Sequence, residues 1–274
     1  MRRIVGGLAA GLIALGGAAA AAPVPRVFSL DQCADQYVIA LAPRDAIVGV
    51  SFRVAASDSY LKAQAAGLPR RRATAEAVLA AQPDIVVRYW GGDARLDQTL
   101  TRRRLRVVRI DEAAGFDGVR ANIRKVAAAL GQVPRGEALI ARMNNQLKHG
   151  AGAWRGEPAL YLTPGGFTAG RDTLVGAMLS GAGLSDVAPA GYGAVPPETL
   201  VMRPPRRVVL GFFDGSSPAA WGPGRQGLLR RMASARAVDS LPGAILGCPA
   251  WFAGDAVQSL AARAGPRAGP HTSQ

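Results

Sequence analysis

A short segment that predicts a helix followed by a strand occurs twice in this chain, and it constrains the fold more than any other feature. The first copy is Ala75–Val87 (AEAVLAAQPDIVV) and the second is Pro197–Val209 (PETLVMRPPRRVV). In each copy a glutamate, Glu76 or Glu198, opens an apolar helical turn, a proline follows seven residues later, and a β-branched run comes next. Two copies predict two similar lobes, each with one acidic residue at the same place.

The rest of the chain alternates strand-type runs with helical spacing. The predicted strands are Val27–Leu30, Ile47–Ser51, Ile85–Val87, Val107–Ile110, Ala159–Leu162 and Val208–Phe213. The predicted helices are Cys33–Leu41, a helix from Thr74, Asp93–Arg103, Phe116–Leu130, Thr173–Ser180 and Asp255–Ala262. This alternation predicts an α/β fold with parallel sheets and helices on both faces.

A long helix is predicted between the two halves. It begins at Pro134, a favoured first-turn residue, and runs to between Lys148 and Ala153. We therefore expect an N-terminal α/β lobe over residues 22–131, a connecting helix within 132–156 and a C-terminal α/β lobe over 157–262. Residues 263–274 repeat Arg-Ala-Gly-Pro and are predicted to be disordered.

The N-terminus has the pattern of a cleavable export signal over residues 1–21. A basic Met1–Arg3 is followed by an apolar stretch that is too short to span a membrane and then by small residues, with cleavage expected near Ala21. No cysteine closely follows this site, so we expect a free periplasmic protein without a lipid anchor.

The chain is strongly basic, with a formal net charge of +14, but this charge does not point to nucleic acid. The basic residues are almost all arginine and are spread along a chain rich in Ala, Gly and Pro, and export removes the protein from nucleic acid. An attraction to anionic ligands remains.

The chain contains two cysteines, Cys33 and Cys248. An even count in an oxidising compartment favours a disulfide that would tie the start of the first lobe to the end of the second. Two separate buried thiols are the alternative.

Neither a metal centre nor a hydrolytic site has strong support in the sequence. The only histidines are His149 and His271, far apart in the chain, so no metal site is expected. Ser59 and Lys62 match the Ser-x-x-Lys motif of exported penicillin-recognising enzymes, but the Ser-Asp-Asn and Lys-Thr-Gly elements are missing. An exported serine hydrolase is therefore the enzymatic alternative.

Aromatic and arginine residues follow several predicted strands. In parallel sheets ligands bind at the carboxyl ends of the strands, and there the chain has Phe52, Arg53, Arg88, Trp90 and Phe213. Further arginines that could bind carboxylate, catecholate or phosphate groups are Arg70, Arg72 and Arg171. These residues predict a ligand cleft. Local core packing is the alternative for the aromatics, and a solvated surface position is the alternative for the arginines.

The ordered set of motifs resembles the periplasmic substrate-binding proteins of iron-siderophore and vitamin B12 ABC importers. Arg26–Leu30 with Asp35 and Ile47–Ser51 is similar to the opening of that family, and Glu76–Val87 is similar to its E-x-V-L-x-x-x-P-D-L-V segment. Phe167–Gly170 with Thr173–Leu174 is similar to its second-lobe opening.

The resemblance implies two Rossmann-like lobes joined by one long helix, with the ligand in the cleft. It also implies that Glu76 and Glu198 pair with arginines of a dimeric permease, an interaction that competes with simple stabilisation of a helix N-terminus by an acid. Phe52, Trp90, Tyr192 and Trp251 fall at or near positions of aromatics in the family. Arginines at 70–72 stand where the family can place a tryptophan, which favours an anionic iron chelate or haem over cobalamin.

The expected function is that of a non-enzymatic carrier without a cofactor. It would capture a ferric siderophore, haem or cobalamin and deliver it to an inner-membrane ABC permease dimer with its ATPase. A sensor that presents the same ligand to a receptor would share every sequence feature.

Overall fold

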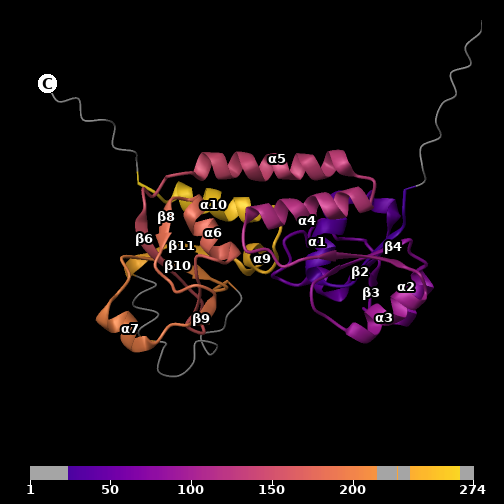
Figure 1. Ribbon diagram of the computed structural model, residues 1–274, viewed down its shortest axis with the longest axis horizontal. Coiled ribbons are helices and arrows are strands. Elements are labelled where there is room, and N and C mark those ends of the chain that lie inside the picture. The colour runs from indigo at the N-terminus through magenta and orange to yellow at the C-terminus, as the bar shows by residue number, and fades with distance from the viewer. Residues whose placement is uncertain (1–23, 215–226, 228–234, 266–274) are drawn as a thin grey trace, which may run out of the picture.

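The computed structural model describes residues 24–214, 227 and 235–265, and these form two α/β lobes (Figure 1). The predicted signal peptide, residues 1–21, and residues 266–274 of the predicted tail lie outside the described residues. No helix in the described ranges is long and apolar enough to cross a membrane. The two-lobed α/β fold with parallel sheets, predicted from the repeat and the alternation, is confirmed.

The N-terminal lobe is built on a five-stranded parallel sheet in the order β3-β2-β1-β4-β5. The strands are β1 (Val27–Ser29), β2 (Ile47–Ser51), β3 (Arg70–Arg71), β4 (Ile85–Tyr89) and β5 (Arg106–Ile110). The helices are α1 (Gln32–Leu41), α2 (Ala75–Ala81), α3 (Ala94–Arg102) and α4 (Phe116–Ala129), with 3₁₀ turns η1 (Arg44–Ala46) and η2 (Phe52–Ala55). Side-chain oxygens of Asp31, Thr74 and Asp93 cap α1, α2 and α3, which fixes where these helices begin.

The C-terminal lobe is built on a four-stranded parallel sheet in the order β11-β10-β6-β8. Its strands are β6 (Glu157–Leu162), β8 (Leu184–Asp186), β10 (Arg207–Gly211) and β11 (Ala237–Leu241), and β7 (Phe167–Ala169) pairs antiparallel with β9 (Tyr192–Ala194). Its helices are α6 (Leu174–Gly181), α7 (Pro197–Met202), α9 (Gly243–Leu246) and α10 (Ala253–Ala262).

The duplicated sequence segment forms the same unit in each lobe. The first copy is α2 followed by β4, and the second is α7 followed by β10. Strand β4 pairs with β1, the first strand of its lobe, and β10 pairs with β6, the first strand of the other lobe. The repeat therefore places Glu76 and Glu198 in the first turns of equivalent short helices.

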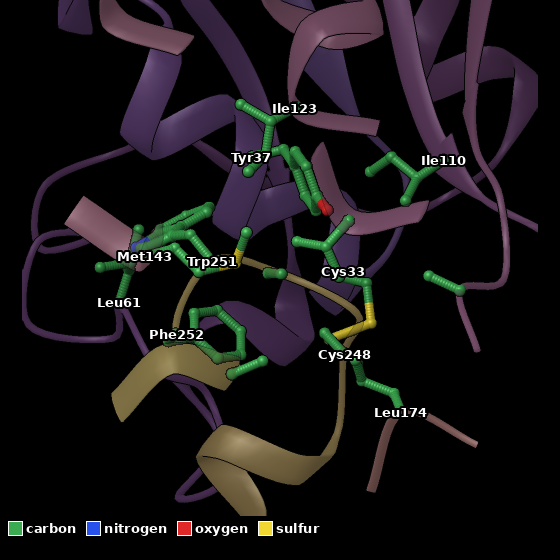
Figure 2. Close-up of a cluster of buried hydrophobic side chains, with 14 of the residues drawn as sticks. Cys33, Tyr37, Leu61, Ile110, Ile123, Met143, Leu174, Cys248, Trp251 and Phe252 are labelled. Carbon is green, nitrogen blue, oxygen red and sulfur yellow. A yellow bond between two sulfur atoms is a disulfide. The ribbon is translucent and has the colours of Figure 1, made fainter. Parts of the chain in front are cut away.

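The connecting helix is α5 (Val133–Gly150), which runs along one side of both lobes and packs on α4 and α10 (Figure 1). Its 18 residues give a length of about 27 Å. One continuous hydrophobic core includes Tyr37 of the first lobe, Met143 of α5 and Phe252 near the end of the chain (Figure 2). The lobes are thus packed together through shared apolar side chains.

Cys33 and Cys248 form a disulfide, with Cα atoms 5.4 Å apart and a sequence separation of 215 (Figure 2). The predicted bridge between the two lobes is confirmed. Close by, the Tyr37 hydroxyl donates a hydrogen bond to the carbonyl oxygen of Pro249. The final segment of the described chain is therefore joined both covalently and by a hydrogen bond to α1.

Candidate functional site

The carboxyl ends of the N-lobe strands present aromatic side chains to one edge of the sheet. Because β2, β4 and β5 are parallel, their ends meet at this edge. Phe52 follows β2 with 59% of its side chain exposed, and Trp90 follows β4 with 53% exposed. Large aromatic side chains this exposed indicate a surface that can receive an apolar or planar ligand.

The C-lobe contributes Tyr192, which opens β9 and is 69% exposed. A cavity of about 150 Å³ is lined by Tyr89 and Glu112 from the first lobe and by Tyr192, Leu174 and other residues from the second. Tyr192, predicted from the resemblance, thus lies across from the ends of β4 and β5. Residues of both lobes therefore line a common cleft.

Glu112 is a cleft residue that the sequence analysis missed. It lies two residues after the end of β5, and its Oε2 accepts hydrogen bonds from both the Tyr89 hydroxyl and Trp90 Nε1. Burial and these contacts raise the pKa of Tyr89, because a neighbouring carboxylate disfavours the phenolate. The signal was available, since an acidic residue just after a predicted strand satisfies the rule that identified Trp90.

Phe212 and Phe213 follow β10 at the end of the equivalent C-lobe strand. Phe213, the predicted contact, is partly buried against an apolar cluster of the C-lobe. Phe212 is 40% exposed and has a φ of 61°, a left-handed conformation that is strained for a bulky side chain. The more exposed ring at this strand end is thus that of Phe212, one residue before the predicted position.

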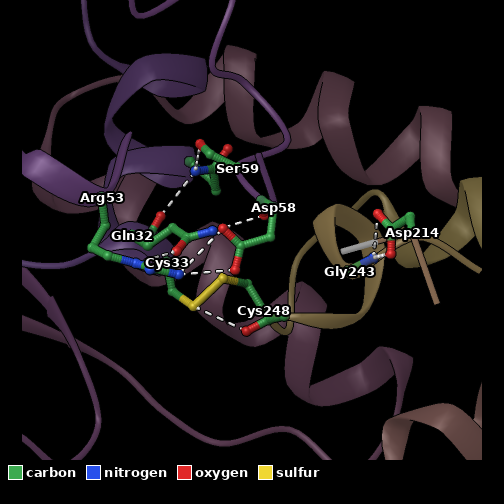
Figure 3. Close-up of polar contacts among 10 residues, drawn as sticks. Gln32, Cys33, Arg53, Asp58, Ser59, Asp214, Gly243 and Cys248 are labelled. Carbon is green, nitrogen blue, oxygen red and sulfur yellow. Dashed lines mark hydrogen bonds and ion pairs between the residues drawn. A yellow bond between two sulfur atoms is a disulfide. The ribbon is translucent and has the colours of Figure 1, made fainter. Parts of the chain in front are cut away.

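Arg53 is held by an ion pair beside the disulfide. Its Nη2 lies 2.9 Å from Asp58 Oδ2, and its Nε donates to Gln32 Oε1 at 3.1 Å (Figure 3). Its charge is therefore already matched by a carboxylate, although the guanidinium remains exposed. In the same figure Asp214, after β10, accepts a hydrogen bond from the Gly243 amide at 3.0 Å.

Arg88 was predicted to contact the ligand, but its side chain is only 4% exposed and forms an ion pair with Asp97 of α3. The prediction is wrong for this residue, because the guanidinium faces the inside of the lobe. Gly92, at a φ of 82°, leaves space for the Arg88 guanidinium, because a Cβ at position 92 would lie 2.0 Å from Arg88 Nη2. Gly92 therefore makes room for the Arg88 side chain, whereas a Cβ on Gly91 would meet no atom within 4 Å.

The remaining predicted arginines are exposed. Arg70 lies in β3 at the sheet edge and Arg72 directly follows it, whereas Arg171 lies in the loop before α6. None of the three forms an ion pair with another residue in the described ranges. Each could therefore bind an anionic group, Arg70 and Arg72 at β3 in the N-terminal lobe and Arg171 before α6 in the C-terminal lobe.

Trp251 was also expected to contact the ligand, but it lies in the core at 2% exposure. Its ring meets Tyr37 edge-on at a centroid distance of 5.8 Å and Phe252 at 5.3 Å (Figure 2). A ligand cannot reach this indole without displacing core residues. The Trp-Phe pair instead packs the end of the second lobe against α1.

Glu76 and Glu198 are both exposed, each in the first turn of its helix. The backbone amide of Glu76 and the Thr74 hydroxyl lower the pKa of the Glu76 carboxyl. Helices α2 and α7 lie on the side of the molecule away from α5, one in each lobe (Figure 1). Both carboxylates are therefore accessible to a partner.

Ser59 does not have the geometry of a nucleophile. Its side chain is 2% exposed, and its hydroxyl accepts a hydrogen bond from Gln36 Nε2 at 3.1 Å, whereas the Lys62 side chain is exposed. Across residues 24–214, 227 and 235–265, no group of three or more His, Cys, Asp or Glu residues could hold a metal ion.

A larger cavity of about 530 Å³ lies within the C-lobe, and its lining includes Gly191 and Gly193 on either side of Tyr192. It is mostly apolar and lies among β6, β9 and α7, with Leu160, Val195 and Leu200 in its lining and Arg203 at its edge. No residue of the first lobe lines this cavity, so it does not lie between the two lobes.

Two solved structures share this fold over nearly their whole length. A periplasmic heme-binding protein from Pseudomonas aeruginosa is 25% identical, with a TM-score of 0.67, over 90% of this chain and 95% of that one. Periplasmic heme-binding protein RhuT from Roseiflexus sp. RS-1 is 22% identical, with a TM-score of 0.68, over 88% and 98%.

Sequence comparison gives a further relative and a family. A cobalamin-binding protein of Halobacterium salinarum is 28% identical over 200 residues, which are 68% of this chain and 53% of that protein. The chain therefore spans about half the length of the curated relatives it matches. The profile of the periplasmic binding proteins matches residues 27–211. This match covers most of the chain, which belongs to the periplasmic binding protein family.

Proposed function

We propose that this protein is the solute-binding component of an ABC importer and captures a ferric siderophore, haem or cobalamin in the periplasm. The observation that carries the proposal is the cleft lined by both lobes, with exposed Phe52 and Trp90 following β2 and β4 and exposed Tyr192 opening β9. Trp90, Phe52 and Tyr192 offer flat apolar faces suited to a macrocycle or aromatic chelate. The family is one of binding proteins, and those similar proteins named above bind heme or cobalamin.

The connections between the lobes support capture by a preset cleft rather than by a wide closing motion. The disulfide, the shared core and α5 all join the two lobes. A cleft that is already formed lowers the entropy cost of binding, because fewer groups must be ordered around the ligand. We therefore expect the two lobes to move little when the ligand enters.

Delivery would require a partner in the inner membrane. Glu76 and Glu198 are exposed at equivalent places in the two lobes, which fits a dimeric permease that presents one basic site to each. In this proposal the glutamates serve the permease, and the aromatic residues of the cleft serve the cargo. Export to the periplasm would depend on the signal peptide predicted over residues 1–21.

Tryptophan-quenching titrations of the mature protein with cobalamin, haemin and a panel of ferric siderophores test the proposal. We expect saturable binding of at least one of these ligand classes, weakened tenfold or more in Trp90→Ala. The matched control is Trp154→Phe, because Trp154 lies outside the cleft with its Nε1 bonded to the Leu260 carbonyl. The absence of binding by all three classes would overturn the proposed function.

A further inference from the structure

We propose that the cleft contains a subsite, built on Glu112 beside the end of β5, for an uncharged side arm that donates hydrogen bonds. The inference rests on the proposed function and narrows its ligand to a planar macrocycle with amide arms, as in a corrinoid, in place of the anionic chelate or haem that Arg70 and Arg72 favoured in the sequence. At this place the subsite rejects a carboxylate or catecholate arm. Glu112 is thus a specificity-determining residue of the cleft.

The first support is the fixed position of the Glu112 carboxylate. Tyr89 and Trp90 both donate to Oε2, so two aromatic groups hold one oxygen in place. The other oxygen, Oε1, accepts no hydrogen bond from any residue that the structure describes. A carboxylate oxygen is a strong acceptor only, so this atom is available to an N–H group and unfavourable for an anion.

The same contacts hold the indole of Trp90. Its ring is 53% exposed, yet its Nε1 is bonded to Glu112, and its face meets Tyr89 edge-on at 6.1 Å between centroids. An exposed ring held in this way is a preorganised surface for stacking. The acceptor and the stacking surface are therefore set side by side.

The second support is the shape of the adjoining cavity. Its volume of about 150 Å³ is well below the range of roughly 300–1,000 Å³ that holds a whole small ligand. Its lining combines the polar side chains of Glu112, Tyr89 and Tyr192 with the apolar side chains of Leu174, Val175 and Met178. This space suits a short arm with a methylene stem and a polar head, while the ring lies outside it.

The third support concerns the first-lobe arginines predicted to bind the ligand, which are distant from β5 or already paired with a carboxylate. The exposed Arg70 and Arg72 stand at β3, four strand spacings from β5 in the sheet, or about 19 Å. This separation exceeds the Debye length of about 8 Å at physiological salt. Arg88 is paired with Asp97, and Arg53 with Asp58. The nearby Lys125 is paired with Asp111.

The negative charge of Glu112 also acts across the cleft. The pKa of the Tyr192 hydroxyl is raised by burial first and then by the charges of Glu112 and Asp172. An anionic arm between the two lobes would meet the same field. A primary amide would instead donate to Oε1 without repulsion.

The test compares two ligands that share one ring and differ in their arms. Dicyanocobinamide carries amide arms, and dicyanocobyrinic acid carries carboxylates on the same corrin. We expect the protein to bind the amide form at least tenfold more tightly. Glu112→Gln should reduce this ratio about tenfold, because it removes the charge and keeps an acceptor for Tyr89 and Trp90.

Two further variants make the test specific. Asp111→Asn removes the neighbouring charge, which is engaged by Lys125, and should leave the ratio within a factor of two. Glu112→Ala should weaken both ligands, because it also releases Trp90. Circular dichroism and melting curves matching those of the wild type establish that each variant is folded.

The outcomes separate the subsite from the proposed function. A ratio that is unchanged in Glu112→Gln, or reduced equally in Asp111→Asn, overturns the subsite and leaves import standing. If neither corrinoid binds but haemin or a ferric triscatecholate does, the assignment of an amide arm is overturned and the proposed import function stands. If none of these probes binds, both the proposed function and the subsite fall.

Discussion

Trp251 packs against the rings of Tyr37, Tyr60 and Phe252 in the core, so replacing it should lower stability rather than remove a ligand contact. Replacing a buried tryptophan with alanine leaves a cavity and costs about 3–5 kcal/mol of unfolding free energy. We expect Trp251→Ala to lose about this amount, measured by urea denaturation of the oxidised protein. Trp90→Ala, at an exposed position, should change stability by less than about 1 kcal/mol. Similar stability losses in the two variants would contradict this division.

Asp35 is a buried acid whose charge should make stability depend on pH. Its side chain is fully buried on α1, and burial raises its pKa to about 6, although hydrogen bonds from Ser29 and Ser51 oppose the shift. The folded state therefore binds a proton more readily than the unfolded state, whose carboxyl titrates near 3.8. The stability from the protonated form is complete below pH 3.8 and is lost as the pH rises through about 6.

The two values differ by an amount that corresponds to about 3 kcal/mol at most. Asp35→Asn carries no titrating group and should flatten the pH dependence of the unfolding free energy between pH 4 and 6. Chemical denaturation at a series of pH values measures this slope. Asp45→Asn changes an exposed acid and serves as the control. A slope equal to that of the wild type in Asp35→Asn would refute the assignment.

At the residue scale, the sequence located strand ends but did not show which side chains there stay exposed and which are buried or paired. Phe52 and Trp90 are exposed after strands that the hydrophobic pattern located, and their contact with a ligand stays a prediction. Arg88 was misplaced because its ion pair with Asp97 depends on how α3 packs against β4, which no local pattern encodes. Trp251 was misplaced because its burial depends on the second lobe meeting α1.

At the scale of elements, hydrophobic periodicity and capping residues predicted the long helices. The short strands form through pairing with neighbouring strands, which the local sequence does not encode. Helices α4 and α5 were predicted nearly to their observed ends, with Pro134 in the first turn of α5. Strand β3 has only two arginines and is ordered by pairing with β2. Strands β8 and β9 have three residues each, so their short polar and glycine-containing sequences carry little β signal.

The two copies of the repeat differ in how their helices begin. Thr74 caps α2 through its side chain, whereas α7 begins with Pro196 and Pro197 and has no side-chain cap. Both nonetheless present a glutamate in the first turn. Because the two helices begin in different ways, stabilisation of the helix N-terminus does not explain why both copies carry a glutamate. A partner that contacts both glutamates explains it better.

Charge reversal tests that partner. We expect Glu76→Lys with Glu198→Lys to abolish permease-stimulated uptake, because two attractive contacts become repulsive, while ligand affinity stays within a factor of two. Uptake into vesicles with the cognate permease and ligand titration of the free protein are the two measurements. Asp45→Lys is the control, since Asp45 lies before β2 at the opposite edge of the sheet from the helix N-termini. An equal loss of uptake and of affinity would place the glutamates in the cleft or the fold.

At the scale of the whole molecule, polar contacts join the lobes on the side of α5. Asp255 of α10 accepts a hydrogen bond from Tyr60 of the first lobe and lies 3.0 Å from Arg142 Nη2 of α5. The Tyr60 ring also stacks on Phe252, with centroids 4.2 Å apart. These contacts and the disulfide all join residues 248–255 to the first lobe or α5. We therefore expect each of them to add to the stability that the others give the packing between the lobes.

The disulfide has the largest expected effect on the molecule as a whole, because it closes a loop that contains most of the chain. In the chain-entropy model a loop of this length stabilises the folded state by about 5 kcal/mol, and loss of a native bridge typically costs about 2–5 kcal/mol. We expect Cys33→Ala with Cys248→Ala to lose an amount in that range in urea denaturation. Reducing agent should destabilise the wild type similarly and leave the double variant unchanged. If the bridge also keeps the cleft preset, ligand affinity should fall in the double variant even where it remains folded. Unchanged affinity would show that α5 and the shared core are sufficient to hold the lobes in the binding arrangement.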